Sequence, residues 1–293
     1  MGITRAELNF LRYVHKFGNF NKTVTIGRQS LLISKNALNK LIPADNKYKP
    51  EKYVDKLLKD YFHSTLVNSI DISDYENATI IHDMNTPIPK NLKHKYNTVI
   101  DSGSLEHVYN ITQALENVSF LCKQGGQIIH MLPANNNCGH GFWQMSPELF
   151  FSLYSNRNGY KNTEVFLVRM SHPEYFYKVI KPENGRRVIV YSKDELYLFV
   201  RTILSTTKFS HSNVQQSDYV YAWDNKNKKI LMNNLSLFNF IRRHELIYNL
   251  TKPLNKTLHK LMSKIEPTNG LTKFNPNLIK FDINSLIAYK ANK

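Results

Sequence analysis

Short apolar runs alternate with amphipathic segments along the first two thirds of the chain. In residues 4–17 apolar side chains recur at helical spacing, and Thr4 with Glu7 three positions later fits a capping box. The same periodicity and the punctuating residues predict further helices over 34–41, 50–62 and 105–123, the last ended by Gly125–Gly126, and another starting near Pro147.

Runs rich in β-branched and aromatic residues lie between these helices and predict strands. Up to residue 133 they are KTVTI, TLVNSID, TII, YNTVID and QIIHMLP, and beyond residue 160 they are TEVFLVRM, EYFYKVIKP, RRVIVYSKD and ELYLFVRTILS. Short apolar strands that alternate with helices are typical of a parallel sheet covered on both faces. The pattern therefore predicts the α/β fold class.

The strand pattern fades after Ser205 and divides the chain into two predicted parts. Residues 1–205 form the α/β domain, with its core over about 20–205, and 206–293 form a basic, mainly helical C-terminal extension. Within that extension 233–266 has a helical pattern, and 267–293 is interrupted by Pro and Asn, which indicates loose packing.

Composition narrows the classes of protein. The two cysteines among 293 residues, Cys122 and Cys138, exclude a disulfide-dense scaffold and a four-cysteine zinc site. No apolar run approaches the ~18 residues of a membrane span, and Met1–Phe20 lacks a signal-peptide core, so we expect a soluble, cytoplasmic protein. The net charge of +16 permits contact with nucleic acid, although solvated lysines explain it more simply. The oligomeric state is not encoded in these patterns.

Polar residues gather where the predicted strands end. Successive ends carry Gly27-Arg28-Gln29, Asp71, His82-Asp83 and Asp101-Ser102-Gly103. In a doubly wound sheet, ligands bind in the crevice outside the carboxyl ends of the strands, and an acid after the second strand binds ribose hydroxyls. The set therefore suits an adenosine.

These segments resemble class I S-adenosylmethionine-dependent methyltransferases, which have a Rossmann-like fold. The resemblance covers about residues 20–205 and is carried by TVTIGRQS, NSIDISDYENATIIHDMN, YNTVIDSGSLEHVYN and LCKQGGQIIHMLP. It implies S-adenosyl-L-methionine as cofactor. By position it assigns Gly27, Arg28 and Gln29 to the methionine-side loop, Asp71 to the ribose, Asp83 with Met84 to the adenine, and Asp101 with Ser102 to the sulfonium region.

The first loop departs from the family pattern. It reads GRQS, with one glycine where the family has GxGxG, and Arg28 is the candidate to contact the cofactor carboxylate instead. Structural roles compete with these assignments: Gly27 also suits a plain turn, and Asp71, Asp83 and Asp101 also suit caps or turns. Asp74 and Glu76 are alternative ribose acceptors.

The loop ANNNCGHGFWQMSPELF follows the fifth predicted strand and is the candidate acceptor site. Asn135, Trp143 and Gln144 are candidate substrate-binding residues, because aromatic rings and amides suit hydroxylated acceptors. His140 and His107 are candidate catalytic bases. The competing interpretations are a packed surface loop and a structural His107.

The histidines do not recur at zinc-ligand spacing, so we predict no metal site. The predicted function is methyl transfer from S-adenosylmethionine to a small molecule or saccharide. The alternatives are an RNA methyltransferase, favoured by charge, and a catalytically silent methyltransferase-fold binding protein, favoured by the single-glycine loop.

Overall fold

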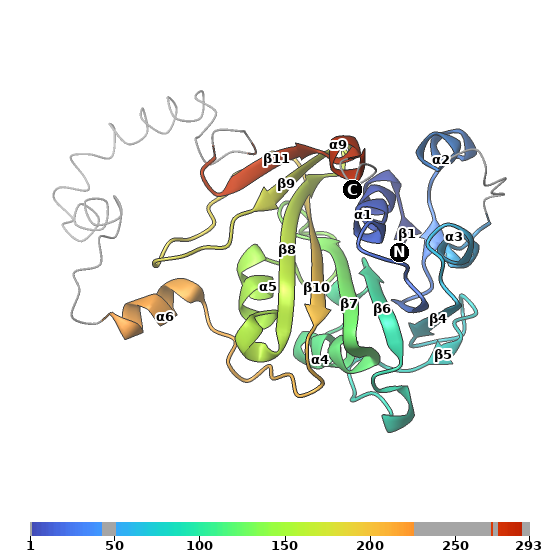
Figure 1. Cartoon of the computed structure of the whole chain (residues 1–293), viewed down its shortest axis with the longest axis horizontal. Helices are drawn as coiled ribbons and strands as arrows, with labels where there is room; N and C mark the ends of the chain where they lie inside the picture. The colour runs from blue at the N-terminus through green and yellow to red at the C-terminus, as the bar shows by residue number, and fades with distance from the viewer. Residues whose placement is uncertain (1, 43–50, 226–270, 272–274, 289–293) are drawn as a thin grey trace.

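Nine strands form one mixed sheet in the order β11-β9-β8-β10-β7-β6-β2-β4-β5 (Figure 1). The computed structural model describes residues 2–42, 51–225, 271 and 275–288. The strands of this sheet are β2 (Lys22–Ile26), β4 (Leu66–Asp71), β5 (Ile80–Ile81), β6 (Tyr96–Ser102), β7 (Cys122–Pro133), β8 (Tyr160–Arg169), β9 (Tyr175–Val179), β10 (Leu196–Leu204) and β11 (Leu278–Asp282). A separate parallel pair joins β1 (Gly2–Ile3) to β3 (Ser30–Leu31).

The five strands from β2 to β7 are parallel, and β10 is antiparallel between β7 and β8. The order β5-β4-β2-β6-β7 reproduces the 3-2-1-4-5 order of a Rossmann sheet, in which the chain reverses direction between strands 1 and 4. The predicted α/β, Rossmann-like fold is confirmed by this order. Its switch point lies between β2 and β6.

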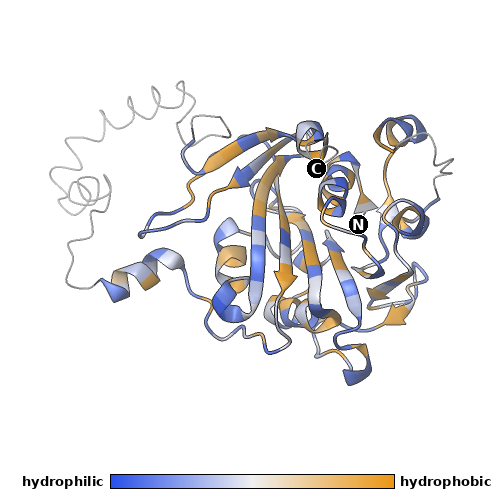
Figure 2. Cartoon of the chain, in the orientation of Figure 1, coloured by the Kyte–Doolittle hydropathy of each residue, from blue (hydrophilic) through white to orange (hydrophobic). Residues whose placement is uncertain are grey.

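Helices cover both faces of the sheet and define two apolar cores. On one face lie α4 (Ile111–Leu121) and α5 (Pro147–Leu153), which pack over the inner side chains of β7, β8 and β10. The other face carries α1 (Arg5–His15), α2 (Lys35–Leu41), α3 (Asp55–Asp60) and α9 (Ile283–Ala288) (Figure 1). Apolar residues recur along the central strands, as their burial on two faces requires (Figure 2).

The N-terminal helix illustrates how the sequence sets local structure. Its capping box is present: the Thr4 side chain accepts from the Ala6 amide, and the Glu7 carboxylate accepts from the Thr4 amide at 2.9 Å. The helix places Phe10 among three aromatic rings of the sheet, with centroid distances of 5.7 Å to Phe166, 6.0 Å to Phe176 and 5.3 Å to Phe199.

The predicted helix over 105–123 is wrong in its extent. A 3-10 turn, Leu105–His107, comes first, and α4 starts after Asn110, whose side chain accepts from the Gln113 amide. The helix is interrupted because Val108 is extended and its carbonyl accepts from the Trp143 indole, a contact from a distant loop.

Other boundaries also differ from the predictions. Gly125 and Gly126 lie within β7 rather than at the end of a helix, because Cys122 is already extended and starts the strand. α3 is shorter than the predicted helix over 50–62, and RRVIVYSKD forms no strand beyond a single bridge at Tyr191. In the segment 186–194, Val188 and Val190 pack against the core, whereas Ile189 and Tyr191 are exposed.

Part of the expected C-terminal extension belongs to the main sheet. β11 pairs antiparallel with β9, and α9 packs beside α1. A further helix, α6 (Ser217–Asp224), follows β10, and the predicted helical segment 233–266 lies outside the described residues. Across the described residues, no helix combines the length and apolarity needed to span a membrane.

We predict that Phe10→Ala lowers the free energy of unfolding by about 3–5 kcal/mol, because it opens a cavity among three packed rings. Urea unfolding followed by circular dichroism measures the change. The control is Phe142→Ala, whose ring is 69% exposed and whose loss costs under about 1 kcal/mol. Equal effects of the two substitutions would contradict the packing described here.

Candidate functional site at the carboxyl edge of the sheet

The strand register brings the predicted loop residues to one edge. Ile26 pairs with both Ile70 and Asp101, and Asp101 pairs with His130. Adjacent strands lie ~4.8 Å apart, so the ends of β4, β2, β6 and β7 are consecutive neighbours along this edge. Gly27, Asp71 and Asp101 therefore lie together at the carboxyl edge around the switch point.

Asp71 is available to a ligand. Its Oδ1 accepts from the Ile72 amide at 2.7 Å, and its Oδ2 has no partner among the described residues. The residue is half-buried, whereas Asp74, an alternative acceptor, is exposed and lies beyond the strand. Asp71 is therefore better placed than Asp74 to accept hydrogen bonds from a ligand in the crevice.

Asp83 closes a turn. Its Oδ1 accepts from the amide and the side chain of Asn85 at 2.9 and 2.8 Å. These hydrogen bonds, the backbone one foremost, hold the pKa of the Asp83 carboxyl below its usual value. Asn85 in turn accepts from the Asn110 amide, so the turn is attached to the start of α4. Met84 beside it is buried in the core.

The residues predicted to bind the methionine part of the cofactor make contacts within the protein instead. Gly27 has φ +68°, which favours glycine, and its amide donates to the Ile70 carbonyl at 2.7 Å. Arg28 donates to the carbonyls of Glu76 and Asn77 and stacks on Tyr53 at 4.1 Å. The Arg28 guanidinium, which was predicted to contact a cofactor carboxylate, is thus hydrogen-bonded to the loop after β4.

Gln29 bridges the switch point. Its amide nitrogen donates to the Ile26 carbonyl at 2.7 Å and to Ser104 Oγ at 3.2 Å, and the Ser104 hydroxyl donates back to Ile26. Gln29 is only 1% exposed. Its side chain therefore joins the loops that follow β2 and β6 instead of lining an open crevice.

Asp101 is buried and acts through its neighbours. Its Oδ1 accepts from the amides of Ser104 and Leu105 at 3.3 and 3.2 Å, and its Oδ2 meets His130 Nδ1 at 2.8 Å. The other ring nitrogen of His130 lies 2.7 Å from the hydroxyl of Tyr154, the residue that follows α5. An imidazole that donates at Nδ1 and accepts at Nε2 satisfies all three groups.

This buried chain was not predicted. Burial raises the pKa of Tyr154 well above its usual value, so its hydroxyl remains a donor. His130 lies in the apolar strand β7 and Tyr154 directly follows α5, and neither segment carries a motif that pairs them. Ser102, next to Asp101, is also buried.

Three predicted or neighbouring residues converge above β6. Oε1 of Glu106 lies 3.2 Å from His140 Nε2 and 3.8 Å from His107 Nε2, and the carboxylate is fully buried while both imidazoles are half-exposed. Burial, with the negative charge of Asp101 as a second cause, raises the pKa of Glu106 to about 8. Burial also lowers the pKa of His107. This Glu-His-His group is the set of described residues that offers metal-ligand atoms close together.

The loop 134–146 is fastened onto Glu106. The Phe142 amide donates to the Glu106 carbonyl at 2.7 Å, and Gly141 has φ +73° where a Cβ would lie 2.8 Å from that carbonyl oxygen. The Trp143 indole donates to Val108 at 2.9 Å, and Gln144 accepts from the Asn137 amide. Trp143 and Gln144 therefore shape the loop, which leaves the ring of Phe142 exposed.

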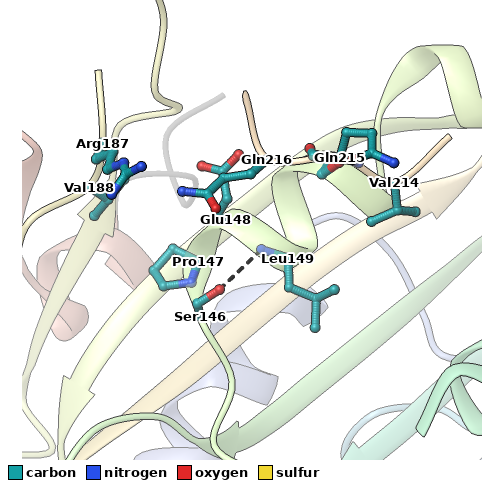
Figure 3. Close-up of a pocket in the computed structure, with 10 residues that line it drawn as sticks. Ser146, Pro147, Glu148, Leu149, Arg187, Val188, Val214, Gln215 and Gln216 are labelled. Carbon is teal, nitrogen blue, oxygen red and sulfur yellow. Dashed lines mark hydrogen bonds between the residues drawn. The ribbon is translucent and has the colours of Figure 1, made fainter. Parts of the chain in front are cut away.

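Asn135 lies on a different side of this loop. It lines a hollow of about 220 Å³ together with Met145 and Leu196. An adjoining hollow of about 450 Å³ lies between α5, Arg187–Val188 and Val214–Gln216, and shares Ser146 and Pro147 with the first (Figure 3). Neither His140 nor Trp143 lines either of these hollows.

Comparisons with known proteins found similar chains among solved structures only. No family model matches the chain, and no curated protein matches its sequence. Similar solved structures include the N-methyltransferase NodS of Bradyrhizobium japonicum, with 13% identity over 69% of this chain and 95% of that one and a TM-score of 0.37. A SAM-dependent methyltransferase of Thermotoga maritima has 11% identity over 67% and 88%, with a TM-score of 0.37.

A third similar structure is the branched-chain polyamine synthase of Thermus thermophilus, with 11% identity over 72% of this chain and 57% of that one and a TM-score of 0.36. The class of protein that the sheet order defines is a Rossmann-like α/β protein.

We predict that Glu106→Gln changes how stability depends on pH in chelator-containing buffer. Because its folded-state pKa is raised, Glu106 ionises more easily in the unfolded chain, so wild-type stability falls as pH rises from about 4.5 to about 8. The glutamine variant lacks this loss. Thermal melts should therefore show a difference in Tm, variant minus wild type, that grows across the window. Parallel curves would contradict the raised pKa.

Proposed function

We propose that this protein transfers a methyl group from S-adenosylmethionine to an oxygen or nitrogen of a small-molecule or saccharide acceptor. The observation that carries the proposal is a single juxtaposition. The loop that we expect to face the acceptor is hydrogen-bonded to Glu106. Glu106 comes five residues after Asp101, which the family resemblance assigns to the sulfonium region. The residues that we assign to the donor and to the acceptor would thus share one edge of the sheet.

The adenosine side of the edge fits the cofactor. Asp71 offers a half-buried carboxylate oxygen without a partner, which suits the hydroxyls of a ribose. Asp83 would border the adenine across its turn. The cofactor would supply a sulfonium methyl group, and these acids would orient it.

The acceptor side offers proton acceptors at the surface. His140 Nε2 lies 3.2 Å from Glu106 Oε1, and this contact would orient the imidazole so that its other nitrogen, Nδ1, accepts the proton. His107, with its ring centroid 5.3 Å from that of His140, is the alternative base. Trp143 would stabilise this loop while the exposed Phe142 contacts the acceptor. Positioning of donor and acceptor supplies much of the acceleration in such transfers, so one base is sufficient.

A catalytically silent binding protein is the second candidate, and one observation favours it. The amide of Gly27 and the side chains of Arg28 and Gln29 are used internally, so the predicted methionine-side contacts are not offered to a ligand. An RNA acceptor, which charge alone suggests, gains no support from the described residues.

We predict that S-adenosylhomocysteine binds the full chain and that Asp71→Ala weakens its affinity by ~10–100-fold, through loss of charge-assisted hydrogen bonds of ~1.5–3 kcal/mol. Isothermal titration calorimetry measures both affinities. Asp74→Ala, three residues further along an exposed loop, is the matched control and should bind normally. An absence of heat and of thermal shift with wild-type protein would favour the silent candidate.

Incubation of the protein with labelled methyl donor and pooled small molecules or saccharides tests the acceptor. We expect label to appear in a low-molecular-mass product by mass spectrometry, and His140→Ala to reduce the rate about 10²-fold or more. Labelling confined to RNA would replace the proposed acceptor class.

A further inference from the structure

The cluster of Glu106, His107 and His140 contains a buried oxygen that no donor satisfies. Oε1 of Glu106 faces both imidazoles, whereas Oε2 is buried without a hydrogen-bond partner among the described residues. Buried polar atoms in proteins are nearly always paired, and a charged one without a partner costs several kcal/mol. The other oxygen of this carboxylate, Oε1, lies toward the two rings, so three ligand atoms surround one point.

The surrounding backbone holds the three side chains in place. The amides of Ser104 and Leu105 donate to Asp101, which fixes the turn that carries Glu106 and His107. On the other side, the His140 amide donates to the Asn137 carbonyl at 2.9 Å, and the Phe142 amide binds the Glu106 carbonyl. Glu106 and His140, which are 34 positions apart in the sequence, are therefore brought together by backbone hydrogen bonds of the two loops that carry them.

We propose that Glu106, His107 and His140 bind one divalent transition-metal ion. Their ligand atoms all lie within 4.8 Å of one another, with 3.2 and 3.8 Å between Glu106 Oε1 and the two Nε2 atoms. Ligands held ~2.0–2.2 Å from a tetrahedral ion are ~3.4 Å apart, so a small inward movement completes the site. The ion would be bound by Glu106 through Oε1, the oxygen that lies beside both imidazoles.

The donor set selects the class of ion. Two imidazoles and one carboxylate suit Zn²⁺, Fe²⁺ or Mn²⁺, whereas Mg²⁺ and Ca²⁺ prefer sites made of oxygen atoms. Three protein ligands leave open positions, and the half-exposed imidazoles place these positions toward solvent. An open position takes water or the hydroxyl oxygen of a small molecule.

As metal ligands, His107 and His140 would have a role other than that of a catalytic base. With an ion bound, both Nε2 atoms are ligands, and neither ring accepts a proton there. A hydroxyl oxygen of the acceptor would then bind the ion directly, an extension that rests on the proposed methyl transfer. The ion site itself does not depend on that transfer, because it is formed by residues of this chain alone.

The spacing of histidines along the sequence, on which the expectation of no metal site rests, does not reveal this arrangement. Glu106 and His107 are adjacent, and the third ligand comes from a separate loop. Such a set has no local signature of the zinc-finger or HExxH kind.

The test measures metal binding without any methyl donor. Full-length protein is stripped with a chelator and titrated with Zn²⁺ by calorimetry, and bound metal is counted by elemental mass spectrometry. Co²⁺ serves as a second probe, since its visible absorption reports coordination by nitrogen and oxygen. We expect one ion per chain with its absorption band lost on adding Zn²⁺.

Glu106→Gln, His107→Gln and His140→Gln should each weaken Zn²⁺ binding by more than ~100-fold, since loss of outer-shell partners alone costs 10–100-fold. His172→Gln is the matched control, because His172 is an exposed histidine with Nδ1 3.5 Å from the Glu174 carboxylate and no second histidine ligand. It should bind as the wild type does. Because the His107 and His140 side chains are half-exposed, their variants should retain the wild-type melt, so they carry the test if Glu106→Gln misfolds.

A chain that binds no stoichiometric Zn²⁺ or Co²⁺, or that binds them equally well after all three substitutions, overturns the proposal and leaves a hydrogen-bonded cluster only. Titration of the stripped protein with S-adenosylhomocysteine is run separately. Metal binding without cofactor binding counts against the proposed methyl transfer alone, and cofactor binding without metal binding counts against the metal site alone.

Discussion

The buried carboxylate of Asp101 determines the geometry of the carboxyl edge. A charged group taken out of water is stable in a protein only when hydrogen bonds replace its hydration. Two backbone amides satisfy one oxygen, and His130 satisfies the other. Because His130 also meets Tyr154, this one residue couples β6, β7, α5 and the turn at Leu105–His107. The position of Glu106 follows from that coupling.

Glu106 adds a second buried acid close to the first. Its charge is disfavoured by burial and by Asp101, and proteins tend to concentrate such perturbed groups where they act on ligands. At the switch point, a hydrogen bond from Gln29 to Ser104 joins the loops that follow β2 and β6. The polar side chains that a ligand could contact therefore lie on either side of this hydrogen bond. Asp71 lies on one side, and the cluster of Glu106, His107 and His140 lies on the other.

Local patterns predicted most of the elements but fewer of the roles. The Thr4 capping box, the Ser34 cap and the strand that ends at Asp71 depend on neighbours in sequence, and they are present. The helix over 105–123 was overestimated because a distant indole takes up the Val108 carbonyl. Arg28 was assigned to a ligand by position in the loop, although a carbonyl pair 48 and 49 residues away binds its guanidinium.

By itself the sequence determined the α/β alternation, the parallel core and the set of strand ends, because periodicity and capping act over one or two turns of chain. The tertiary structure decided which of those strand-end side chains remain available to a ligand and which form hydrogen bonds within the protein. It also decided that His140 meets Glu106, and that β11 returns to the sheet edge. These outcomes depend on contacts between segments far apart in the chain, and the free energy of such contacts is set by burial and shape that no local pattern records.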